Sequence, residues 1–449
     1  MIFLAKAKVY YTDARGGNYH LSLAHKVKEL FYEAGLHEAI QPGDIVAIKI
    51  HVGEWNRTSC LRPELVAAVV ECVKESGGRP FVTDTTTLSY HPWSSRYNAY
   101  YELLTAYRHG FTPDALGCPL IIADGFHGED DVRVDLPEGI ILKEAYIARM
   151  IAEADVLINL AHGKGHPVTS FGGCIKNIGI GAQSKRGKYQ VHMALWGDPK
   201  DAIGWPSVDK TKCPGKECPY WQLCEQSCPE GAIKITEKGL EFDFDKCKFC
   251  WSCAVLCVLV AGKAAIGFPK PDYFPLNQIA MADAALGCAK TKKPGKLVNM
   301  MYLIDITPWC DCFPWGDIPI APDIGILASK DVVAIDAAAL DLVDKAPIVP
   351  WSRAEELGLK PGDDKFKAVN GFPPRVQVKA GEKIGLGTTD YELIEYKPEL
   401  TPETVGKHQI QKTPTIPWLK RVYERKHILE GVLPFKRAKF GTVDWHVFE

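Results

Sequence analysis

The order of apolar and polar positions along the chain predicts strands and helices in alternation. Short apolar runs of strand length recur through the first third, and segments with helical spacing lie between them. One such segment opens at Pro63, and Gly77 and Gly78 end it. The predicted strands are Asp44–His51, Arg79–Asp84, Pro119–Asp124 and Asp155–His162, and the predicted helices are Pro63–Val73, Ser94–His109 and Leu142–Ala154.

The same alternation returns in the last third of the chain. A helical pattern covers about Leu276–Ala289, strand-like runs cover Lys296–Ile306 and Pro322–Ala328, and a capped helix follows over Asp331–Val343. Strands that alternate with helices indicate an α/β fold, with a mainly parallel sheet covered by helices on both faces.

Composition excludes several classes of protein. The chain has 449 residues, 53 basic against 55 acidic side chains and a net charge of −2, so it lacks the basic surface of a nucleic-acid-binding protein. No apolar run approaches the ~18 residues that a membrane span requires. The N-terminal segment lacks the layout of a signal peptide and predicts a first strand. We therefore expect a cytoplasmic protein that binds neither nucleic acid nor membrane.

Cysteine is the residue type that adds most to this picture. Fifteen cysteines without an export signal favour a reducing compartment, where thiols serve metals or catalysis. Eight of them form two quartets, Cys213-x4-Cys218-x5-Cys224-x3-Cys228 and Cys247-x2-Cys250-x2-Cys253-x3-Cys257. A C-x2-C-x2-C run supplies three thiolates to a cubane [4Fe–4S] cluster, and a distant cysteine supplies the fourth. Zinc also favours cysteine quartets, but usually as paired knuckles across a longer spacer. Because such clusters are usually sensitive to oxygen, we expect an anaerobic host.

The stretch 208–266 resembles bacterial two-cluster ferredoxins, and Cys228-Pro-Glu-Gly-Ala-Ile resembles their exit turn. In those proteins the last cysteine of each run binds the other cluster. The resemblance implies two [4Fe–4S] clusters, one held by Cys213, Cys218, Cys224 and Cys257, the other by Cys247, Cys250, Cys253 and Cys228. The first quartet departs from the family spacing, which leaves open whether both Cys213 and Cys218 are ligands.

These patterns predict four parts. The α/β domain comprises residues 1–207 and 267–396, and the ferredoxin-like module of residues 208–266 is inserted within it. A tail, 397–449, is rich in proline, aromatic and basic residues. The tail could wrap the body or a partner subunit, or it could be a solvated basic face.

Polar residues follow the predicted strands at the places where parallel strands end. They are Lys49, His51 and Glu54, then Thr83, Asp84 and Thr85, then Asp124, His162 and Asp305. In open α/β sheets, ligands bind beyond the carboxyl ends of the strands. The sequence therefore predicts a pocket at that edge, in which His51, His162 or Asp84 would handle protons.

A glycine-rich segment follows the strand that ends at His162. It contains Lys164, His166, Gly172, Gly173 and Lys176. Glycine lets the backbone approach a ligand, and backbone amides with a nearby lysine can hold an anion. An anion or carboxylate site and a plain tight turn are both open, and Lys49, the residues just named and Asp323 are the candidates for binding substrate. The Ser-x-Gly-Gly-x-x-Lys string is similar to a loop in nickel-dependent lactate racemases.

Cys310 and Cys312 lie just beyond another predicted strand. The pair could bind a soft metal together with His51 or His162, or it could be a redox dithiol. Two buried structural thiols are the alternative. Among the later carboxylates, Asp331 is expected to be a helix N-cap, and Asp336 to face solvent or pair with a lysine.

These segments resemble the family catalogued as "domain of unknown function", number 362, in its form with a ferredoxin-type insert. The matching segments are 48–54, 81–85, 123–125, 163–166, 172–179, 305–312 and 322–329. The resemblance implies an iron–sulfur protein of anaerobes and names no reaction.

Two functional hypotheses follow. The first is an oxidoreductase in which the two clusters pass electrons to a small anionic substrate, or to a metal or dithiol centre at Cys310 and Cys312, with an external protein as electron donor or acceptor. The second is a non-catalytic electron carrier or assembly subunit of a larger oxidoreductase. A non-redox enzyme with structural clusters and a homo-oligomer are also open.

Overall fold

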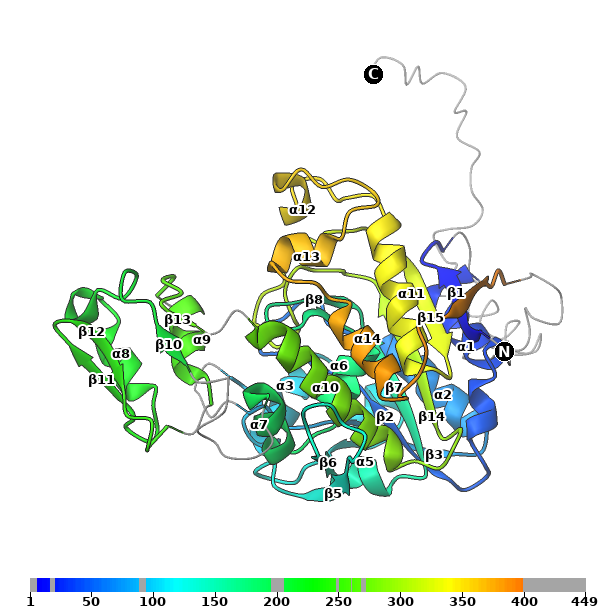
Figure 1. Ribbon diagram of the computed structural model, residues 1–449. Coiled ribbons are helices and arrows are strands. Elements are labelled where there is room, and N and C mark those ends of the chain that lie inside the picture. The colour runs from blue at the N-terminus through cyan, green and yellow to red at the C-terminus, as the bar shows by residue number, and fades with distance from the viewer. Residues whose placement is uncertain are drawn as a thin grey trace, which may run out of the picture. The chain divides into compact units, whose positions relative to one another are not determined.

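An eight-stranded sheet forms the centre of the α/β fold, in the order β16-β1-β15-β14-β7-β2-β3-β4 (Figure 1). The computed structural model describes residues 6–16, 21–88, 94–194, 206–247, 250–259, 261–267 and 272–398. Strand β15 is antiparallel to both of its neighbours, and all other neighbouring pairs in the sheet are parallel. The strands are β1 Ala7–Asp13, β2 Ile45–Lys49, β3 Arg79–Asp84, β4 Leu120–Ile122, β7 Val156–His162, β14 Leu297–Leu303, β15 Gly325–Ser329 and β16 Tyr391–Glu395.

The central strands are buried on both faces because their apolar residues are continuous. In β2, Val46 and Ile48 pack into one apolar cluster while Ala47 packs into the cluster on the opposite face. In β7, Ile158 packs into the same cluster as Val46 and Ile48, and Leu157 packs into the opposite cluster with Ala47. Successive side chains of a strand point to opposite faces, so an unbroken apolar run needs cover on both sides.

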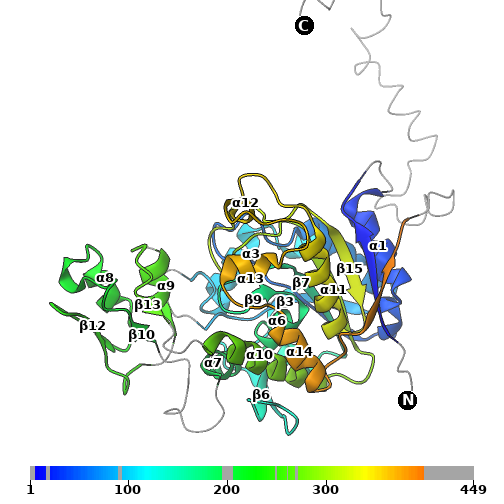
Figure 2. The same cartoon turned by 45° about the horizontal axis from the view of Figure 1, so that its top comes forward.

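Helices supply that cover, as Figure 1 shows. The first apolar cluster contains residues of α1 and α2, and the second contains residues of α6, α10, α11 and α14. Helix α10 packs against both α6 and α14 (Figure 2). The bounds of the helices of the α/β domain are α1 Leu23–Glu33, η2 Leu36–Ala39, α2 Pro63–Glu75, α3 Ala99–Arg108, α4 Pro113–Leu116, α5 Arg149–Glu153, α6 Cys174–Gly179, α7 Lys185–Met193, α10 Tyr273–Lys290, α11 Val332–Lys345, α12 Arg353–Glu356, α13 Lys365–Asn370 and α14 Val376–Lys383.

The predicted mainly parallel α/β fold is confirmed, and most predicted elements agree within a few residues. Helix α3 is shorter than predicted, because Asn98 caps its first turn. The predicted helix Leu142–Ala154 is wrong over most of its length. Strand β6 Glu144–Ala148 occupies its centre and pairs antiparallel with β5 Asp131–Asp135, so only α5 remains helical.

Residues 206–267 form small elements around a separate apolar cluster. Two antiparallel pairs, β10 with β13 and β11 with β12, frame this segment. Its elements are β10 Ser207–Val208, η4 Gly215–Glu217, α8 Trp221–Gln226, β11 Ile233–Thr236, β12 Gly239–Phe242, α9 Ser252–Leu259 and β13 Ile266–Gly267.

The predicted basic tail lies almost entirely outside the described residues, which end at 398. Across the described ranges, no helix has both the length and the apolar character needed to cross a membrane.

The start of α6 is fixed by a carboxylate from a distant helix. Asp336 of α11 is fully buried and accepts hydrogen bonds from the backbone amides of Cys174 at 2.7 Å and Ile175 at 2.9 Å. The expectation that Asp336 faces solvent or pairs with a lysine is therefore wrong. Asp331 is the N-cap of α11, as predicted, and accepts from Val333 and Ala334.

We expect Asp336→Ala to lower the free energy of unfolding by about 2–4 kcal/mol, because two buried amides lose their acceptor. Urea unfolding followed by circular dichroism measures this loss. Asp364→Ala is the matched control, since it removes the partly exposed N-cap of α13, which accepts from the Lys367 amide and is worth about 1 kcal/mol. Equal losses in the two variants would contradict a special role for Asp336.

Candidate functional site

The carboxyl ends of β4, β3, β2, β7 and β14 meet at one edge of the sheet, because these neighbouring strands are parallel. A cavity of about 320 Å³ lies against this edge. Its volume is within the range of small-molecule sites, roughly 300–1,000 Å³. The cavity therefore lies at the edge of the sheet where the strand-end residues predicted a pocket.

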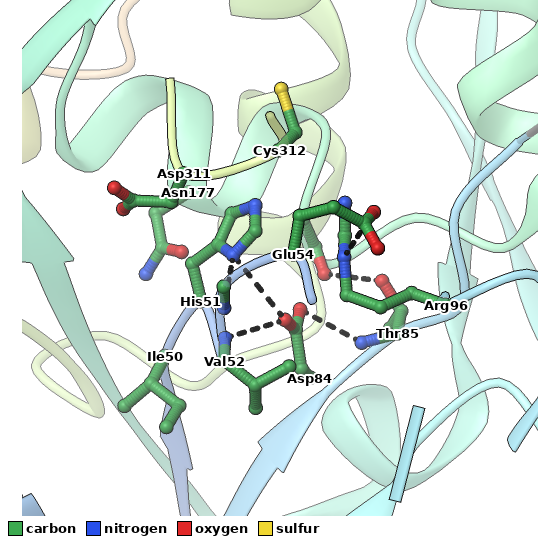
Figure 3. A network of polar contacts seen from close by, with 12 residues as sticks. Ile50, His51, Val52, Glu54, Asp84, Thr85, Arg96, Asn177, Asp311 and Cys312 are labelled. Atoms are coloured by element: carbon green, nitrogen blue, oxygen red, sulfur yellow. Dashed lines mark hydrogen bonds and ion pairs between the residues drawn. The ribbon is translucent and has the colours of Figure 1, made fainter. Parts of the chain in front are cut away.

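Asp84, at the end of β3, is the centre of one polar network at this edge (Figure 3). Its carboxylate lies 2.9 Å from the Lys49 ammonium and accepts hydrogen bonds from the amides of Val52 and Thr85. Although burial opposes ionisation, the Lys49 ammonium, together with the Arg96 guanidinium, holds the pKa of Asp84 well below its usual value. Asp84 is thus an anion that organises the strand ends around it.

His51 lies beside Asp84, with 4.0 Å between Nδ1 and a carboxylate oxygen. The backbone amide of Gly53 donates to Nδ1 at 2.9 Å, so the neutral ring carries its hydrogen on Nε2. Burial, followed by the Arg96 guanidinium, lowers the pKa of His51 well below its usual value. In Figure 3 the second ring nitrogen points away from Asp84. His51 is therefore a neutral ring that can donate a hydrogen bond from Nε2, and its part in handling protons stays a prediction.

Two further cations line the cavity. Arg96 forms a buried ion pair with Glu54 at 3.3 Å. Lys188, on α7, donates to the Thr85 hydroxyl at 2.7 Å and to the Gln183 carbonyl. Burial lowers the pKa of Lys188 to about 8. Among the described residues no carboxylate forms an ion pair with Lys188, although Asp124, Asp84 and Glu102 are near enough to favour its charged form.

Asp311 is the centre of a second network. Its buried carboxylate lies 3.3 Å from Arg57, 2.9 Å from Nδ1 of His162 and 3.1 Å from Lys164. Burial alone would raise the pKa of Asp311, but His162 and Lys164 hold it well below its usual value. Asp311 therefore anchors the turn that carries Cys310 and Cys312.

The two thiols lie on either side of this anchor. One ring nitrogen of His166 and the two sulfurs lie within 4.8 Å of one another. The Lys176 ammonium lies 3.8 Å from the Cys310 sulfur, and the Cys312 amide donates to the same sulfur at 3.4 Å. This group brings together four of the residues predicted from sequence. The histidine beside the thiols is His166, not His51 or His162 as expected.

The glycine-rich segment packs against the protein's own backbone. A Cβ atom on Gly165 would lie 2.1 Å from the Pro308 carbonyl oxygen, and one on Gly173 would lie 2.6 Å from Asp336. Two amides at the start of α6 already donate to Asp336. The described contacts thus favour the tight-turn interpretation over an anion cradle built from backbone amides.

Only some of the residues that the sequence predicted for the site line the cavity. The predicted residues that line it are His51, Asp84, Lys164, His166, Gly173, Lys176 and Cys312. Lys49 is fully buried and bound to Asp84, and both ring nitrogens of His162 face oxygen atoms, those of Asp311 and of the Ile304 carbonyl. Asp323 is exposed and accepts from the amide of Asp305. Cys310 and Gly172 are buried behind the lining.

Four polar residues of the site were not predicted from sequence: Arg57, Arg96, Lys188 and Asp311. Arg57 and Arg96 lie in connections, and Lys188 lies in a polar helix that resembles an ordinary solvated one. Asp311 lies between Cys310 and Cys312, and the sequence predicted only these two cysteines as site residues. A contact with residues far away in sequence is what gives each its role, and no local pattern records it.

The eight quartet cysteines form two groups within residues 206–267. Cys213, Cys218, Cys224 and Cys257 line one small cavity of about 20 Å³, and Cys228, Cys247, Cys250 and Cys253 line another of about 30 Å³. Each group takes three cysteines from one run and one from the other. The Cys228 and Cys257 sulfurs each accept a backbone amide hydrogen bond, from Ala232 and Ala265, at 3.2 Å. Burial, followed by the neighbouring Cys257 thiol, raises the pKa of Cys224 to about 12.

We expect Asp311→Asn to lower the free energy of unfolding at pH 7 by about 3–5 kcal/mol, because Arg57 and Lys164 lose a buried partner. Because the folded pKa of Asp311 is depressed, its contribution is present above the unfolded value of about 4 and is lost as the pH falls further. Urea unfolding between pH 7 and pH 3 should show a shallower acid dependence in the variant. The exposed Asp135→Asn is the control and should change stability by less than about 0.5 kcal/mol. An acid dependence unchanged from the parent chain would contradict this role.

Comparison with known proteins identifies the family. A family model described as "Domain of unknown function (DUF362)" matches residues 46–341. The thylakoid-associated protein sll1697 of Synechocystis sp. is 29% identical over 148 residues, which span 32% of this chain and 41% of that protein. The lactate racemase apoprotein of Thermoanaerobacterium thermosaccharolyticum aligns in structure over 87% of this chain and 82% of its own, at 11% identity and a TM-score of 0.34. Since the family model covers well over half of the sequence, the chain belongs to the DUF362 family.

Proposed function

We propose that the protein is an iron–sulfur redox enzyme with two [4Fe–4S] clusters in residues 208–266 and a substrate site at the sheet edge. One observation carries the proposal. The edge cavity is lined by Cys250, a member of the second quartet, together with His51, Lys176 and Lys188. A thiol expected to hold a cluster thus borders the same space as the polar strand-end residues.

The cysteine groups fit cubane clusters. Four thiols converge in each group, and the three-plus-one exchange between runs is the pattern of two-cluster ferredoxins. Backbone amides that donate to cysteine sulfur are among the features that tune iron–sulfur sites. The crossed arrangement does not favour zinc, whose knuckles usually each supply a pair of ligands. When bound, clusters of this kind exchange single electrons with an external donor or acceptor protein.

The chain's own residues would then bind and orient a small anion. Lys176 and Lys188 supply positive charge, while Leu88, Trp309 and Phe313 supply an apolar wall. Neutral His51 would donate a hydrogen bond to a substrate oxygen, as a neutral imidazole does best where its pKa is depressed. The Gly53 amide would keep this ring in place, and Asp84, paired with Lys49, would stay ionised rather than accept a proton.

The first test is the metal content of protein purified under strict exclusion of oxygen. We expect iron and inorganic sulfide in amounts that correspond to two clusters per chain. Cys224→Ala and Cys253→Ala should each remove about half of the iron, because each lies in a different group. Cys72→Ala, a buried cysteine of α2, is the control and should keep the full content. Zinc without sulfide would overturn the proposal.

The second test is the binding of benzoate, which combines a carboxylate with an apolar ring, by calorimetry. We expect Lys188→Met to weaken binding at least about tenfold, a loss of one charge-assisted hydrogen bond. Since the pKa of Lys188 lies at about 8, affinity in the parent chain should fall as the pH rises above 8. Lys290→Met, on the surface of α10, is the matched control and should bind as the parent does. Equal binding in all variants would favour the electron carrier over the enzyme.

A further inference from the structure

The group formed by His166, Cys310 and Cys312 has two chemical interpretations. Its three ligand atoms lie close enough together for one soft metal ion, and its two sulfurs are also close enough for thiol–disulfide chemistry. The hydrogen bonds of His166 distinguish between these interpretations.

The Nδ1 atom of His166 accepts two backbone hydrogen bonds, from the amides of Val168 and Thr169, both at 3.0 Å. A nitrogen that faces two donors carries no hydrogen, so the neutral ring bears its hydrogen on Nε2. Histidines that bind metal show the reverse arrangement, in which the second nitrogen donates to an oxygen acceptor. The Nε2 atom of His166 lies 3.9 Å from the Cys312 sulfur. His166 is thus a hydrogen-bond donor to sulfur and a poor metal ligand.

The other contacts of Cys310 are also those of a thiolate. Besides the Lys176 ammonium, the Cys312 amide points at the Cys310 sulfur, and His166 adds a third donor. Burial would raise the pKa of Cys310, but hydrogen bonding from Cys312, together with Lys176 and His166, holds it well below its usual value. The hydrogen bond to Cys310 raises the pKa of Cys312 well above the usual value of a cysteine, and burial raises it further. One proton is therefore held between the two sulfurs, on the Cys312 side.

The two sulfurs differ in access. Cys312 lines the cavity and is partly exposed, whereas Cys310 is fully buried behind it. Asp311, between them, is fixed by Arg57, His162 and Lys164, so the turn holds one thiol toward the cavity and the other toward the core.

We propose that Cys310 and Cys312 form a redox-active dithiol, in which Cys312 exchanges with a small disulfide in the cavity and Cys310 resolves the mixed disulfide. Cys312 passes its proton to Cys310 and attacks one sulfur of the small disulfide, which expels the first thiolate. Cys310 then gives that proton to the expelled thiolate in the cavity and attacks the Cys312 sulfur, which expels the second thiolate. The thiolate–thiol pair and the small disulfide become a Cys310–Cys312 disulfide, one small thiol and one small thiolate, so two electrons pass to the small disulfide and the single proton and the charge are conserved.

The inference goes beyond the proposed function, because this exchange needs neither cluster. A protein without iron could still have a titratable dithiol, and a protein with both clusters could lack one. Metal analysis and dithiol titration on the same sample therefore separate failure of the proposal from failure of the inference.

The test equilibrates anaerobic full-length protein with mixtures of reduced and oxidised glutathione, followed by acid quenching, alkylation and mass spectrometry of the peptide that contains both cysteines. We expect one two-electron transition from a doubly alkylated peptide to an unlabelled, internally linked one. Lys176→Met should favour the disulfide by about tenfold, or about 30 mV for a two-electron couple, because the reduced thiolate loses its ammonium neighbour. A purely structural lysine would not move this midpoint.

Single-cysteine variants test the assigned order. Cys310→Ser should trap a stable glutathione adduct on Cys312, whereas Cys312→Ser should form no adduct on buried Cys310. Cys288→Ser, a buried cysteine of α10, is the matched control and should keep the parent transition. Circular dichroism of each variant confirms that it is folded.

Two results would overturn the inference. The first is a peptide that stays doubly alkylated in every glutathione mixture. The second is one tightly held metal ion per chain that blocks alkylation and is lost together from Cys310→Ser and His166→Ala, with the iron of the cysteine quartets unchanged.

Discussion

The strand-edge site depends on the contacts of the buried Asp311 carboxylate with its charged and polar partners. Its three partners come from two parts of the chain: Arg57 from the connection after β2, and His162 and Lys164 from the end of β7 and the start of β8 Lys164–His166. Charges in a protein interior are tolerated only when each is paired and hydrogen-bonded. The four residues therefore fix one another, and the turn that carries Cys310 and Cys312 cannot shift without exposing a charge to an apolar core.

A second buried anion, Asp84, organises the strand ends in the same way. It is held by Lys49 and by two backbone amides, so neither residue is free to meet a ligand. Asp84 and Lys164 line the cavity but are paired within these networks, whereas other polar lining residues have groups left to meet a ligand. His51, Lys188 and Cys312 belong to the second kind. Reactive groups carried by strand ends and supported by a buried shell are held more rigidly than groups on free loops.

The folded structure of the segment 206–267 depends on a different source of stability. Its apolar cluster is small, and three of its buried members are the cysteines Cys224, Cys253 and Cys257. Segments of this size seldom fold on apolar burial alone and usually need a metal or disulfides. The proposed clusters would supply that contribution, which links the stability of the segment to its proposed chemistry.

The sequence by itself determined the α/β sheet, because a continuous apolar run of strand length has to be buried on both faces. It also determined the edge at which the polar residues meet, since parallel strands end on one side, and the N-cap Asp331, which lies next to its own helix. The tertiary structure decided the rest. Asp336 binds amides 161 and 162 residues away, and Asp311 pairs with Arg57 of a distant connection and with His162 and Lys164 of β7 and β8. The strand over Glu144–Ala148 exists because β5 pairs with it, against a helical pattern. The hydrogen on His166 is placed by two amides of its own turn, whose geometry only the folded chain defines. Local spacing encodes elements and their direction, whereas the pairing of buried charges depends on which distant residues the fold brings together.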